Sequence, residues 1–321
     1  MHYDVIIVGS GAAGLAAALY AQRYALKALV AGKEFGGETA TAGTIENWPG
    51  SKEIDGYELV KNMKEHAESV GAEVREGMVS RIEKDKNCFN VFFEDGKEEH
   101  SRAVILAIGA RRRRLNLPRE KEFTGKGVHY CVTCDGPLFT GKTVAMVGGG
   151  DSSVKGINFL GEYAEKIYFI FRTEEPRAEP MNMRRLEDLG DKVVYIPENE
   201  VTELQGENML EKVVLARPHE GSKELQVQGL FVEIGFDPDK TFAEQLGLEL
   251  DESGYLKTDN MMRTNVEGVY AAGDATNHFG SFKQDITASA LGTVAATAAA
   301  DYVKGSQGAC EHYNKKSPQG E

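Results

Sequence analysis

The stretch Val5-Ile6-Ile7-Val8-Gly9-Ser10-Gly11-Ala12-Ala13-Gly14 decides the fold of this chain. A short apolar run rich in β-branched residues leads into the glycines, and the alanine-rich segment 15–24 follows as a predicted helix. Strand, glycine turn and helix in this order form a dinucleotide-binding unit. Gly9 makes the turn, Gly11 lets backbone N–H groups approach a pyrophosphate, and Gly14 allows the helix to pack closely on the strand. The sequence therefore predicts a Rossmann-like domain at this point.

The segment after this fingerprint predicts the rest of that domain. The strand 27–31 leads to Glu34, about 20 residues beyond the fingerprint, where a carboxylate would meet ribose hydroxyls, although a solvated loop glutamate is the alternative. The glycine-rich segment 35–50 carries the only tryptophan, and a loop of this length is usually functional. An amphipathic helix (55–70), alternating strands (73–91) and a buried strand that ends on Gly109 follow.

A second fingerprint follows roughly 140 residues after the first. The apolar strand 143–147 runs into Gly148-Gly149-Gly150-Asp151-Ser152-Ser153, which opens another helix, so the chain is expected to bind two dinucleotides. The next strand (166–171) leads to Arg172 and Arg177 with two glutamates between them. Arginine there favours a 2′-phosphate and an acid favours the free ribose, so both preferences remain open.

The motif Cys131-Val132-Thr133-Cys134-Asp135 lies between the two fingerprints. Cysteines at this spacing form a dithiol/disulfide switch in which one thiol can be held at a lowered pKa, with an acid beside it. Zinc would need a second pair of ligands, and Cys88 and Cys310 are isolated in the sequence, so no metal site is predicted. A buried structural pair is the remaining alternative, which the turn residues after Cys134 disfavour.

Composition limits the class of protein. The chain has 321 residues, 41% hydrophobic residues, 36 glycines, four cysteines and a net charge of −13, which suits two α/β domains. The charge argues against nucleic acid and anionic membranes as partners, and the low cysteine content favours a reducing compartment. With no leader segment or apolar span in view, we expect a soluble, cytoplasmic protein. The arginine run 111–114 is interpreted as a solvated loop rather than a phosphate site, and Cys88 as core packing.

The last third returns to buried elements. The strand 229–235 is followed by Asp237-Pro238, where we expect a crossover of the chain. The small-residue strand 268–274 stops at Asp274, and Lys283-Gln284-Asp285 precede a long alanine-rich helix (286–302), whose N-terminal end could face an electron-rich ring. His278 is expected at the surface, and the polar segment after the helix is expected to fray.

With these residues in hand, the chain resembles the low-molecular-weight thioredoxin reductase family up to about residue 303. The resemblance implies an α/β fold with two Rossmann-like domains, in which a discontinuous FAD domain holds an inserted pyridine-nucleotide domain that carries the cysteine pair. The implied boundaries are 1–113 and 246–303 for the FAD domain, 114–245 for the insert and 304–321 for a polar tail. In that family the two domains swing against each other. Four motifs carry the match: Gly9–Gly14, Ile45-Glu46-Asn47-Trp48-Pro49-Gly50, Cys131–Gly136, and Val269–Asp274 with Lys283-Gln284.

The resemblance also implies roles by motif position. Cys134 would lie nearest the flavin, Cys131 would attack the partner disulfide, and Asp135 would supply or take the proton. The implied FAD contacts are Gly9, Ser10, Gly11, Gly14, Glu34, Gly37, Glu38, Asn47, Gly109, Asp274, Lys283 and Gln284. The implied NADP contacts are Gly148, Gly150, Asp151, Ser152, Ser153, Arg172, Arg177 and Gly235.

The departures from the family pattern concern the electron donor. Alanine is usual where Ser153 stands, and glutamates are usual near Lys155 and Gly156. The usual His-Arg-Arg reads Phe171-Arg172-Thr173 here, and a glutamine is replaced by Glu38. The residues expected to act in disulfide reduction therefore match the family pattern better than the residues expected to bind the electron donor. NADPH is the favoured donor, with NADH or ferredoxin as alternatives.

The sequence thus predicts a flavoprotein that reduces the disulfide of a thioredoxin-like protein, with FAD as cofactor. The family resemblance also implies a homodimer. A redox-sensing flavoprotein that changes conformation without turning over substrate is the alternative from another class, and the acid beside the cysteine pair favours catalysis.

Overall fold

The computed structural model describes residues 2–280, 282–305 and 310, and it divides the chain into two compact units. Unit 1 combines residues 1–111 with 238–321, and unit 2 is the intervening segment 112–237. The predicted boundaries lie two residues later at the first crossing and eight residues later at the second. The difference at the second crossing arises because Phe242 and Ala243 pack into the core of unit 1. The Asp237-Pro238 crossover predicted from the sequence coincides with the second division.

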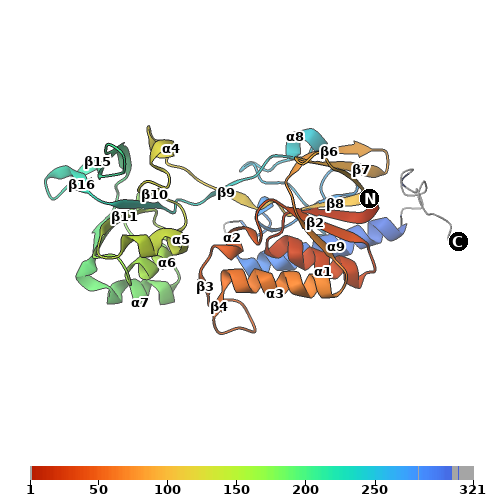
Figure 1. Ribbon diagram of the computed structural model, residues 1–321, viewed down its shortest axis with the longest axis horizontal. Coiled ribbons are helices and arrows are strands. Elements are labelled where there is room, and N and C mark those ends of the chain that lie inside the picture. The colour runs from red at the N-terminus through yellow and green to blue at the C-terminus, as the bar shows by residue number, and fades with distance from the viewer. Residues whose placement is uncertain (1, 281, 306–309, 311–321) are drawn as a thin grey trace. The chain divides into compact units, whose positions relative to one another are not determined.

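Unit 1 is built on a seven-stranded sheet in the order β5-β2-β1-β8-β7-β6, with β19 also paired to β8 (Figure 1). The strands β1, β2, β5, β8 and β19 run parallel, while β6 and β7 form an antiparallel extension. The carboxyl ends of the parallel strands therefore share one edge, where ligands bind in open α/β sheets. The strand bounds are β1 (His2–Val8), β2 (Ala28–Gly32), β5 (Glu73–Glu76), β6 (Val79–Asp85), β7 (Cys88–Phe93), β8 (Glu98–Leu106) and β19 (Val269–Ala271).

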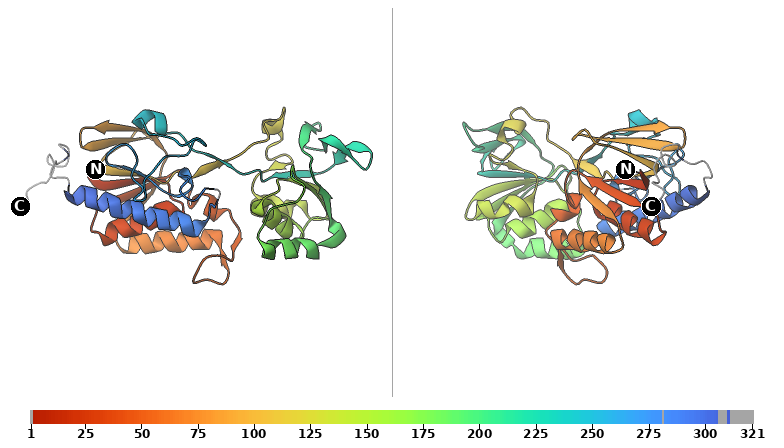
Figure 2. Two further views of the ribbon diagram at one scale, coloured as in Figure 1. Left: turned by 180° about the vertical axis from the view of Figure 1, so that it is seen from behind. Right: turned by 45° about the vertical axis from the view of Figure 1, so that its right-hand side comes forward.

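Alternate residues of these strands face two different cores, as the period of a strand requires. Val5 and Ile7 point to a helical layer of α1 (Ala12–Arg23), α3 (Gly56–Ser69) and α9 (Asp285–Gly305). Figure 2 (left) shows these three helices side by side along one face of the sheet. Ile6 and Val8 point the other way, to the β6–β7 hairpin and α8 (Ala243–Leu246). Helix α9 approaches α1 closely because Gly292 has no side chain: an added Cβ would stand 2.0 Å from the Ala13 carbonyl oxygen.

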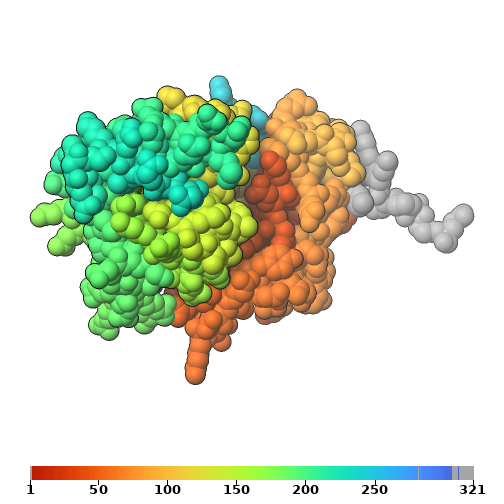
Figure 3. All heavy atoms as spheres, turned by 60° about the vertical axis from the view of Figure 1, so that its left-hand side comes forward, coloured from red at the N-terminus to blue at the C-terminus, as the bar shows by residue number. Residues whose placement is uncertain are grey.

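The segment predicted as one long loop (35–50) contains short regular elements. It forms helix α2 (Gly37–Ala40) and strand β3 (Thr44–Ile45), which pairs with β4 (Ile54–Asp55). The turn between β3 and β4 projects from the body of unit 1, as Figures 1 and 3 show. Helix α3 then begins after Asp55, whose carboxylate caps it by accepting from the N–H groups of Tyr57 and Glu58.

Unit 2 repeats the same plan on a smaller scale. Its parallel five-stranded sheet has the order β10-β17-β11-β12-β13, and helices α6 (Asp151–Leu160) and α7 (Pro180–Asp188) cover one face. A three-stranded antiparallel sheet, β14-β15-β16, packs on the other face. The strand bounds are β10 (Val128–His129), β11 (Thr143–Val147), β12 (Lys166–Ile170), β13 (Val193–Ile196), β14 (Val201–Gln205), β15 (Lys212–His219), β16 (Ser222–Gln226) and β17 (Gly229–Val232). The shorter elements are α4 (Glu120–Phe123), α5 (Val132–Asp135), η1 (Gly136–Phe139) and η2 (Gly190–Lys192). The predicted fold class, α/β with two Rossmann-like domains, is confirmed.

The two chain crossings between the units form a short ribbon in which β9 (Ala110–Arg112) pairs with β18 (Phe236–Pro238). Arg111, Arg113 and Arg114 are exposed, as the interpretation of the run as solvated requires, but Arg111 and Arg112 belong to strand β9 and not to a loop. Acids from the returning crossing accept from three of the guanidinium groups: Arg111–Asp239 at 2.9 Å, Arg112–Glu233 at 2.7 Å and Arg113–Asp237 at 2.7 Å. The fourth arginine, Arg114, stacks over the Tyr130 ring at 5.0 Å.

Cys88 and Cys310 form a disulfide, with an S–S distance of 2.07 Å and Cα atoms 5.3 Å apart. Both residues are buried, so the prediction of core packing for Cys88 was right, although the packing includes a bond to a cysteine that is far away in the sequence. Their separation of 222 positions explains why no local pattern indicated the pairing. The rest of the predicted polar tail beyond Gly305 lies outside the described residues. Within the described ranges, no helix is long and apolar enough to cross a bilayer.

Candidate active site

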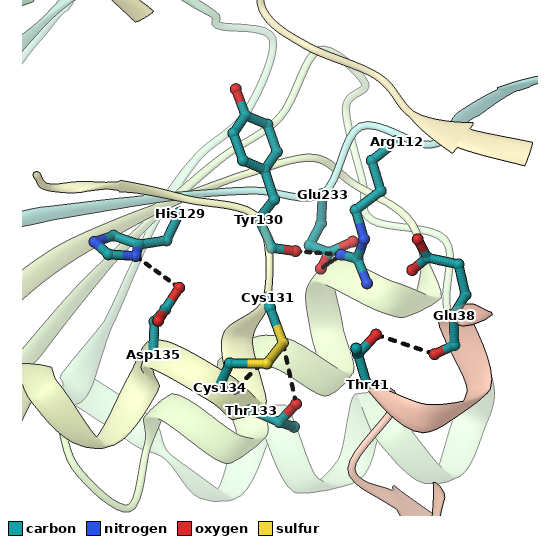
Figure 4. The surroundings of a disulfide bond; sticks show 10 residues. All are labelled: Glu38, Thr41, Arg112, His129, Tyr130, Cys131, Thr133, Cys134, Asp135 and Glu233. Carbon is teal, nitrogen blue, oxygen red and sulfur yellow. Dashed lines mark hydrogen bonds and ion pairs between the residues drawn. A yellow bond between two sulfur atoms is a disulfide. The ribbon is translucent and has the colours of Figure 1, made fainter. Parts of the chain in front are cut away.

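The cysteine pair lies at the start of helix α5, which begins directly after Cys131. Cys131 and Cys134 are joined by a disulfide with Cα atoms 5.3 Å apart (Figure 4). The Cys134 backbone N–H donates to the Cys131 sulfur at 3.3 Å, and Thr133 Oγ1 lies 3.5 Å from the same sulfur. Such contacts stabilise negative charge on Cys131 once the disulfide is reduced. Cys131 is half-buried and Cys134 exposed, so the pair is open to a reacting partner on this unit.

Asp135 is the last residue of α5, and its carboxylate is bound by a histidine that the sequence reasoning missed. His129 Nδ1 lies 2.7 Å from Asp135 Oδ2. The imidazole is 6% exposed, whereas the carboxylate is 33% exposed. Phe139 meets the imidazole edge-on at 5.1 Å between ring centroids, and Phe231 lies at 5.5 Å. The signal in the sequence was slight: a single histidine two residues before the first cysteine of the motif.

A polar network holds the backbone that enters the motif. Arg112 donates to the Tyr130 carbonyl oxygen and to Glu233, so it connects the ribbon between the units to the residue before Cys131 (Figure 4). The Tyr130 hydroxyl donates to Glu120, a buried carboxylate that also accepts from the backbone N–H groups of Leu115 and Leu117. Burial, and then the hydrogen bond to Glu120, raise the pKa of the Tyr130 phenol above its ordinary value.

The first fingerprint has the geometry expected of a pyrophosphate cradle. Gly9 adopts φ +113°, and a Cβ there would stand 2.1 Å from the Ala107 carbonyl oxygen. No side chain caps α1 at Gly11, so the first turn of the helix keeps backbone N–H groups available to an anion. The Ser10 hydroxyl donates to the Glu34 carbonyl at 2.9 Å, and a Cβ on Gly37 would lie 3.6 Å from the Cα of Gly11. The predicted residues of segments 9–14 and 34–38 are therefore neighbours.

The predicted residues of the last third lie against the same fingerprint. A Cβ on Gly273 would stand 2.9 Å from the Cβ of Ala13, which places Asp274 at the start of α1. Burial raises the pKa of the Asp274 carboxyl, against the lowering effect of Lys283. Burial also lowers the pKa of Lys283, whose ammonium donates to the Thr276 carbonyl and lies 4.2 Å above the Tyr255 ring.

The remaining predicted FAD contacts adjoin this cluster. The Asn47 amide donates to Gln284 Oε1 at 2.9 Å, which brings the β3–β4 turn next to the start of α9. Gly109, with φ +67°, follows the carboxyl end of β8. These residues fit FAD: an uncapped helix start stands beside glycines whose added Cβ atoms would clash, at the carboxyl edge of a parallel sheet. Their individual contacts with FAD stay predictions.

The second fingerprint is formed, but its polar side chains bind the protein itself. Gly148 adopts φ +131°, and a Cβ there would meet the Glu233 carbonyl oxygen at 2.0 Å, whereas the space beside Gly150 is open. Ser153 is fully buried and donates to the same carbonyl at 2.9 Å. Asp151 Oδ1 accepts from the Glu179 N–H and from the Asn182 amide, both at 2.9 Å. Ser153 is therefore a packing residue, where the sequence predicted a tolerated substitution.

The two arginines predicted for a 2′-phosphate are exposed on the segment between β12 and α7. The Arg177 N–H donates to the Gly149 carbonyl oxygen at 2.7 Å, so its side chain starts beside the fingerprint. Arg172 follows β12 after the buried Phe171. Neither guanidinium has an ion-pair partner in the described part of the chain, and both are thus available to an anion. Gly235, with φ +96°, lies on the returning crossing.

Comparison with known proteins identifies the class first. The family model described as pyridine nucleotide-disulphide oxidoreductase matches residues 3–299, and the chain belongs to that family. Within it, a thioredoxin reductase of Bacillus subtilis is 38% identical over 305 residues, which cover 94% of this chain and 95% of the relative. The resemblance to the low-molecular-weight thioredoxin reductases is therefore confirmed.

Solved structures agree with this assignment. The thioredoxin reductase of Lactococcus lactis, in the form described as FR, matches with a TM-score of 0.88 and 34% identity over 94% of this chain and 99% of that one. The thioredoxin reductase of T. acidophilum matches with a TM-score of 0.87 and 35% identity, over 94% of this chain and 98% of that one. A ferredoxin-flavin thioredoxin reductase of Clostridium acetobutylicum matches with a TM-score of 0.50 and 31% identity, over 94% and 98%. The family and the cysteine pair make this chain a flavin-dependent disulfide reductase.

Proposed function

We propose that this chain is a thioredoxin reductase, which carries two electrons from NADPH through FAD and the Cys131–Cys134 pair to the disulfide of a thioredoxin-like protein. The observation that carries the proposal is the Cys131–Cys134 disulfide beside Asp135, in a chain that matches thioredoxin reductases over nearly its whole length. The acid beside the pair favours turnover over a sensing role, because exchange with a partner disulfide needs protons.

The thiol chemistry follows from the two sulfurs. In the reduced pair, the Cys131 thiolate attacks one sulfur of the partner disulfide, forms a mixed disulfide and releases the other partner sulfur as a thiolate, which takes up a proton. Cys134 then loses its proton and attacks Cys131, so the Cys131–Cys134 disulfide re-forms and the second partner thiol leaves. The partner gains two electrons and two protons, and the pair loses them. Asp135 is the group proposed to give and take the proton.

FAD, when bound, would accept two electrons from the donor and deliver them to the disulfide. The glycines of the first fingerprint and the start of α1 would bind its pyrophosphate, and Glu34 its ribose. Asp274, Lys283 and Gln284 would contact the rest of the cofactor from the start of α9. The short distances among these segments support one shared cofactor site in unit 1.

NADPH is the proposed donor because Arg172 and Arg177 are exposed, form no ion pair with any residue that the structure describes, and adjoin the second fingerprint. A 2′-phosphate would give both guanidinium groups an anionic partner. Glu174 and Glu175 between them favour the unphosphorylated ribose instead, so NADH is a defined outcome of the test. Ferredoxin is the further outcome, supported by the likeness to the ferredoxin-flavin enzyme and by the altered family residues at Ser153 and Phe171.

The proposal also covers the protein partner, the oligomeric state and the cellular compartment. The partner is a thioredoxin-like protein, as the names of the relatives indicate. The assembly is a homodimer, as the family resemblance implies. The compartment is the cytoplasm, as the low cysteine content indicates. The Cys88–Cys310 disulfide makes this last point testable, because a thiol count on protein isolated under rapid alkylation reports whether that bond exists in the cell.

The deciding experiment is an anaerobic titration of the purified protein with NADPH and then NADH, followed by turnover with thioredoxin. Bleaching of the flavin by NADPH and reduction of thioredoxin support the proposal. Cys131→Ser should abolish thioredoxin reduction while the flavin stays reducible. Bleaching by NADH alone would identify NADH as the donor, and bleaching by reduced ferredoxin alone would identify ferredoxin as the donor. A protein that reduces no thioredoxin with any of these donors contradicts the proposal and favours the redox-sensing role.

A further inference from the structure

We propose that His129 is the positioning residue for Asp135, and that the two side chains exchange the proton that thiol–disulfide exchange at Cys131–Cys134 requires. This inference rests on the proposed function for the role of Asp135 and extends it to a second residue. It starts from the 2.7 Å distance between His129 Nδ1 and Asp135 Oδ2, the one ion pair that the motif's acid makes in the described structure (Figure 4).

The imidazole is held so that Nδ1 faces the acid. His129 ends β10, which pairs in parallel with β17 and places His129 in register with Phe231. The Phe231 ring lies against the imidazole at 5.5 Å, and Phe139 closes its edge at 5.1 Å. The two phenylalanines also contact each other at 5.3 Å, so the three rings form one cluster. A ring so enclosed has few rotamers, and the carboxylate it binds is fixed in turn.

Burial makes this contact stronger than a surface ion pair. The imidazole is 6% exposed, and a hydrogen bond to a charged group is strengthened where water is excluded. The Asp135 side chain is 33% exposed. The pair therefore combines a buried imidazole with a partly exposed carboxylate, one residue after Cys134. This arrangement suits a group that must hold a proton at a defined position and then release it.

The chemistry needs a group that can supply the Asp135 carboxylate with a proton. An imidazole can donate a proton from one ring nitrogen and take one up at the other. In the pair, a protonated imidazole passes its Nδ1 proton to the Asp135 carboxylate, and the carboxylic acid formed in this way then gives that proton to the leaving thiolate. The imidazole regains a proton from solvent afterwards. No electron moves in this step, and each proton lost by the pair is one gained by the departing thiol.

Few other titratable groups face the imidazole. Strand β17 and turn η1 carry none, and α5 carries only Cys134 and Asp135. Helix α6, which packs on α5, carries Asp151 and Lys155, paired with each other at 3.9 Å. Lys142 lies 5.2 Å from the Phe139 ring, beyond the aromatic cluster. On the side of the entering chain, Tyr130 is bound to Glu120, and Arg112 to Glu233. Asp135 is therefore the acid placed to respond to His129.

The test compares two disulfides that differ in the proton they need. Protein reduced anaerobically with dithionite is mixed with the aromatic disulfide DTNB, which releases a stable thiolate, or with hydroxyethyl disulfide, which releases a thiolate that must be protonated. His129→Phe keeps a ring in the cluster but removes Nδ1. It should slow the reaction with hydroxyethyl disulfide on the order of 10- to 100-fold and leave the reaction with DTNB unchanged.

His129→Asn is the second variant, because its amide N–H can replace Nδ1 as a donor but cannot exchange a proton. It should recover the part of the rate with hydroxyethyl disulfide that depends on holding the carboxylate in place, but not the part that depends on a transferable proton. If His129→Phe does not fold, this variant carries the test alone. Asp135→Asn should show the same dependence on the acceptor, and the double variant should be no slower than Asp135→Asn.

Three results would overturn the inference. His129→Phe could react with both disulfides as the wild type does, or both reactions could slow equally, which would indicate a distorted cysteine pair. His129→Asn could keep the full rate with hydroxyethyl disulfide, which would leave the imidazole as a hydrogen-bond donor only. None of these measurements uses thioredoxin or a physiological donor. Failure of the proposed function would appear instead as absent thioredoxin turnover in the wild type.

Discussion

Replacing Cys310 with serine should remove a covalent ring that contains most of the chain. The Cys88–Cys310 bond joins residues 222 positions apart, and the whole of unit 2 lies inside that ring. Closing a loop of this length restricts the unfolded chain and raises the free energy of unfolding by about 5 kcal/mol. If unit 2 stays folded while unit 1 unfolds, the flexible part of the ring is roughly 100 residues and the gain is still about 4.7 kcal/mol.

Differential scanning calorimetry of the oxidised proteins measures this effect. Cys310→Ser should lower the Tm of the transition that belongs to unit 1 by roughly 10 to 20 °C. Cys134→Ser is the matched control, because the ring it opens spans only a sequence separation of 3 and is worth about 2 kcal/mol. Equal Tm values for Cys310→Ser and the wild type would refute the reasoning. Peptide mapping that found free thiols at Cys88 and Cys310 in oxidised protein would refute it as well.

The remaining predictions concern the two nucleotide sites. Alanine at both Arg172 and Arg177 should raise the KM for NADPH on the order of 100-fold, since each charge-assisted hydrogen bond contributes about 1.5–3 kcal/mol. The KM for NADH should stay unchanged. Equal changes in KM for both donors would contradict a contact with the 2′-phosphate. Asp274→Asn should stabilise the flavin-free protein at pH 7, because burial raises the pKa of the Asp274 carboxyl and the charged form that exists at higher pH therefore destabilises the fold. The same variant should bind FAD roughly tenfold more weakly. Thermal unfolding measures the first effect and flavin fluorescence the second, and a flavin-free variant less stable than the wild type would contradict the expected sign. Gly9→Ala should abolish flavin retention because its Cβ would stand 2.1 Å from a carbonyl oxygen. The control, Gly96→Ala, is also at positive φ but has no neighbour within 4 Å, so it should lower the free energy of unfolding by about 1 kcal/mol and retain the flavin. A Gly9→Ala protein that retained the flavin would show that the turn can relax.

The parts of the fold that the sequence predicted correctly are those encoded locally. Each fingerprint consists of a strand, a glycine turn and a helix that are consecutive in the chain, so hydrophobic pattern and glycine spacing suffice to locate them. The predicted helix 286–302 corresponds to α9, and the expected crossover at Asp237-Pro238 coincides with the boundary of the units. The helix starts at Asp285, one residue earlier than predicted, and the difference of a residue or two is normal for helix ends.

The parts that were missed depend on contacts between distant residues. The Cys88–Cys310 bond has a sequence separation too large for any local pattern to indicate. The ion pairs of the arginine run were missed because the acids that bind it follow more than a hundred residues later, on the returning crossing. His129 was missed for another reason. It is close to Asp135 in the sequence, but only the pairing of β10 with β17 turns its ring toward the acid.

The paired crossings have a consequence for protein engineering. The Arg111 Nε and Asp239 Oδ2 atoms are 2.9 Å apart, so the two points at which the chain passes between unit 1 and unit 2 are adjacent in space. A short glycine-rich linker from residue 111 to residue 238 can therefore replace all of unit 2 and leave the seven-stranded sheet of unit 1 complete. The excised unit keeps its own five-stranded sheet and the cysteine pair. We therefore expect that a different domain with a cysteine pair can be inserted at the same position of the flavin-binding unit.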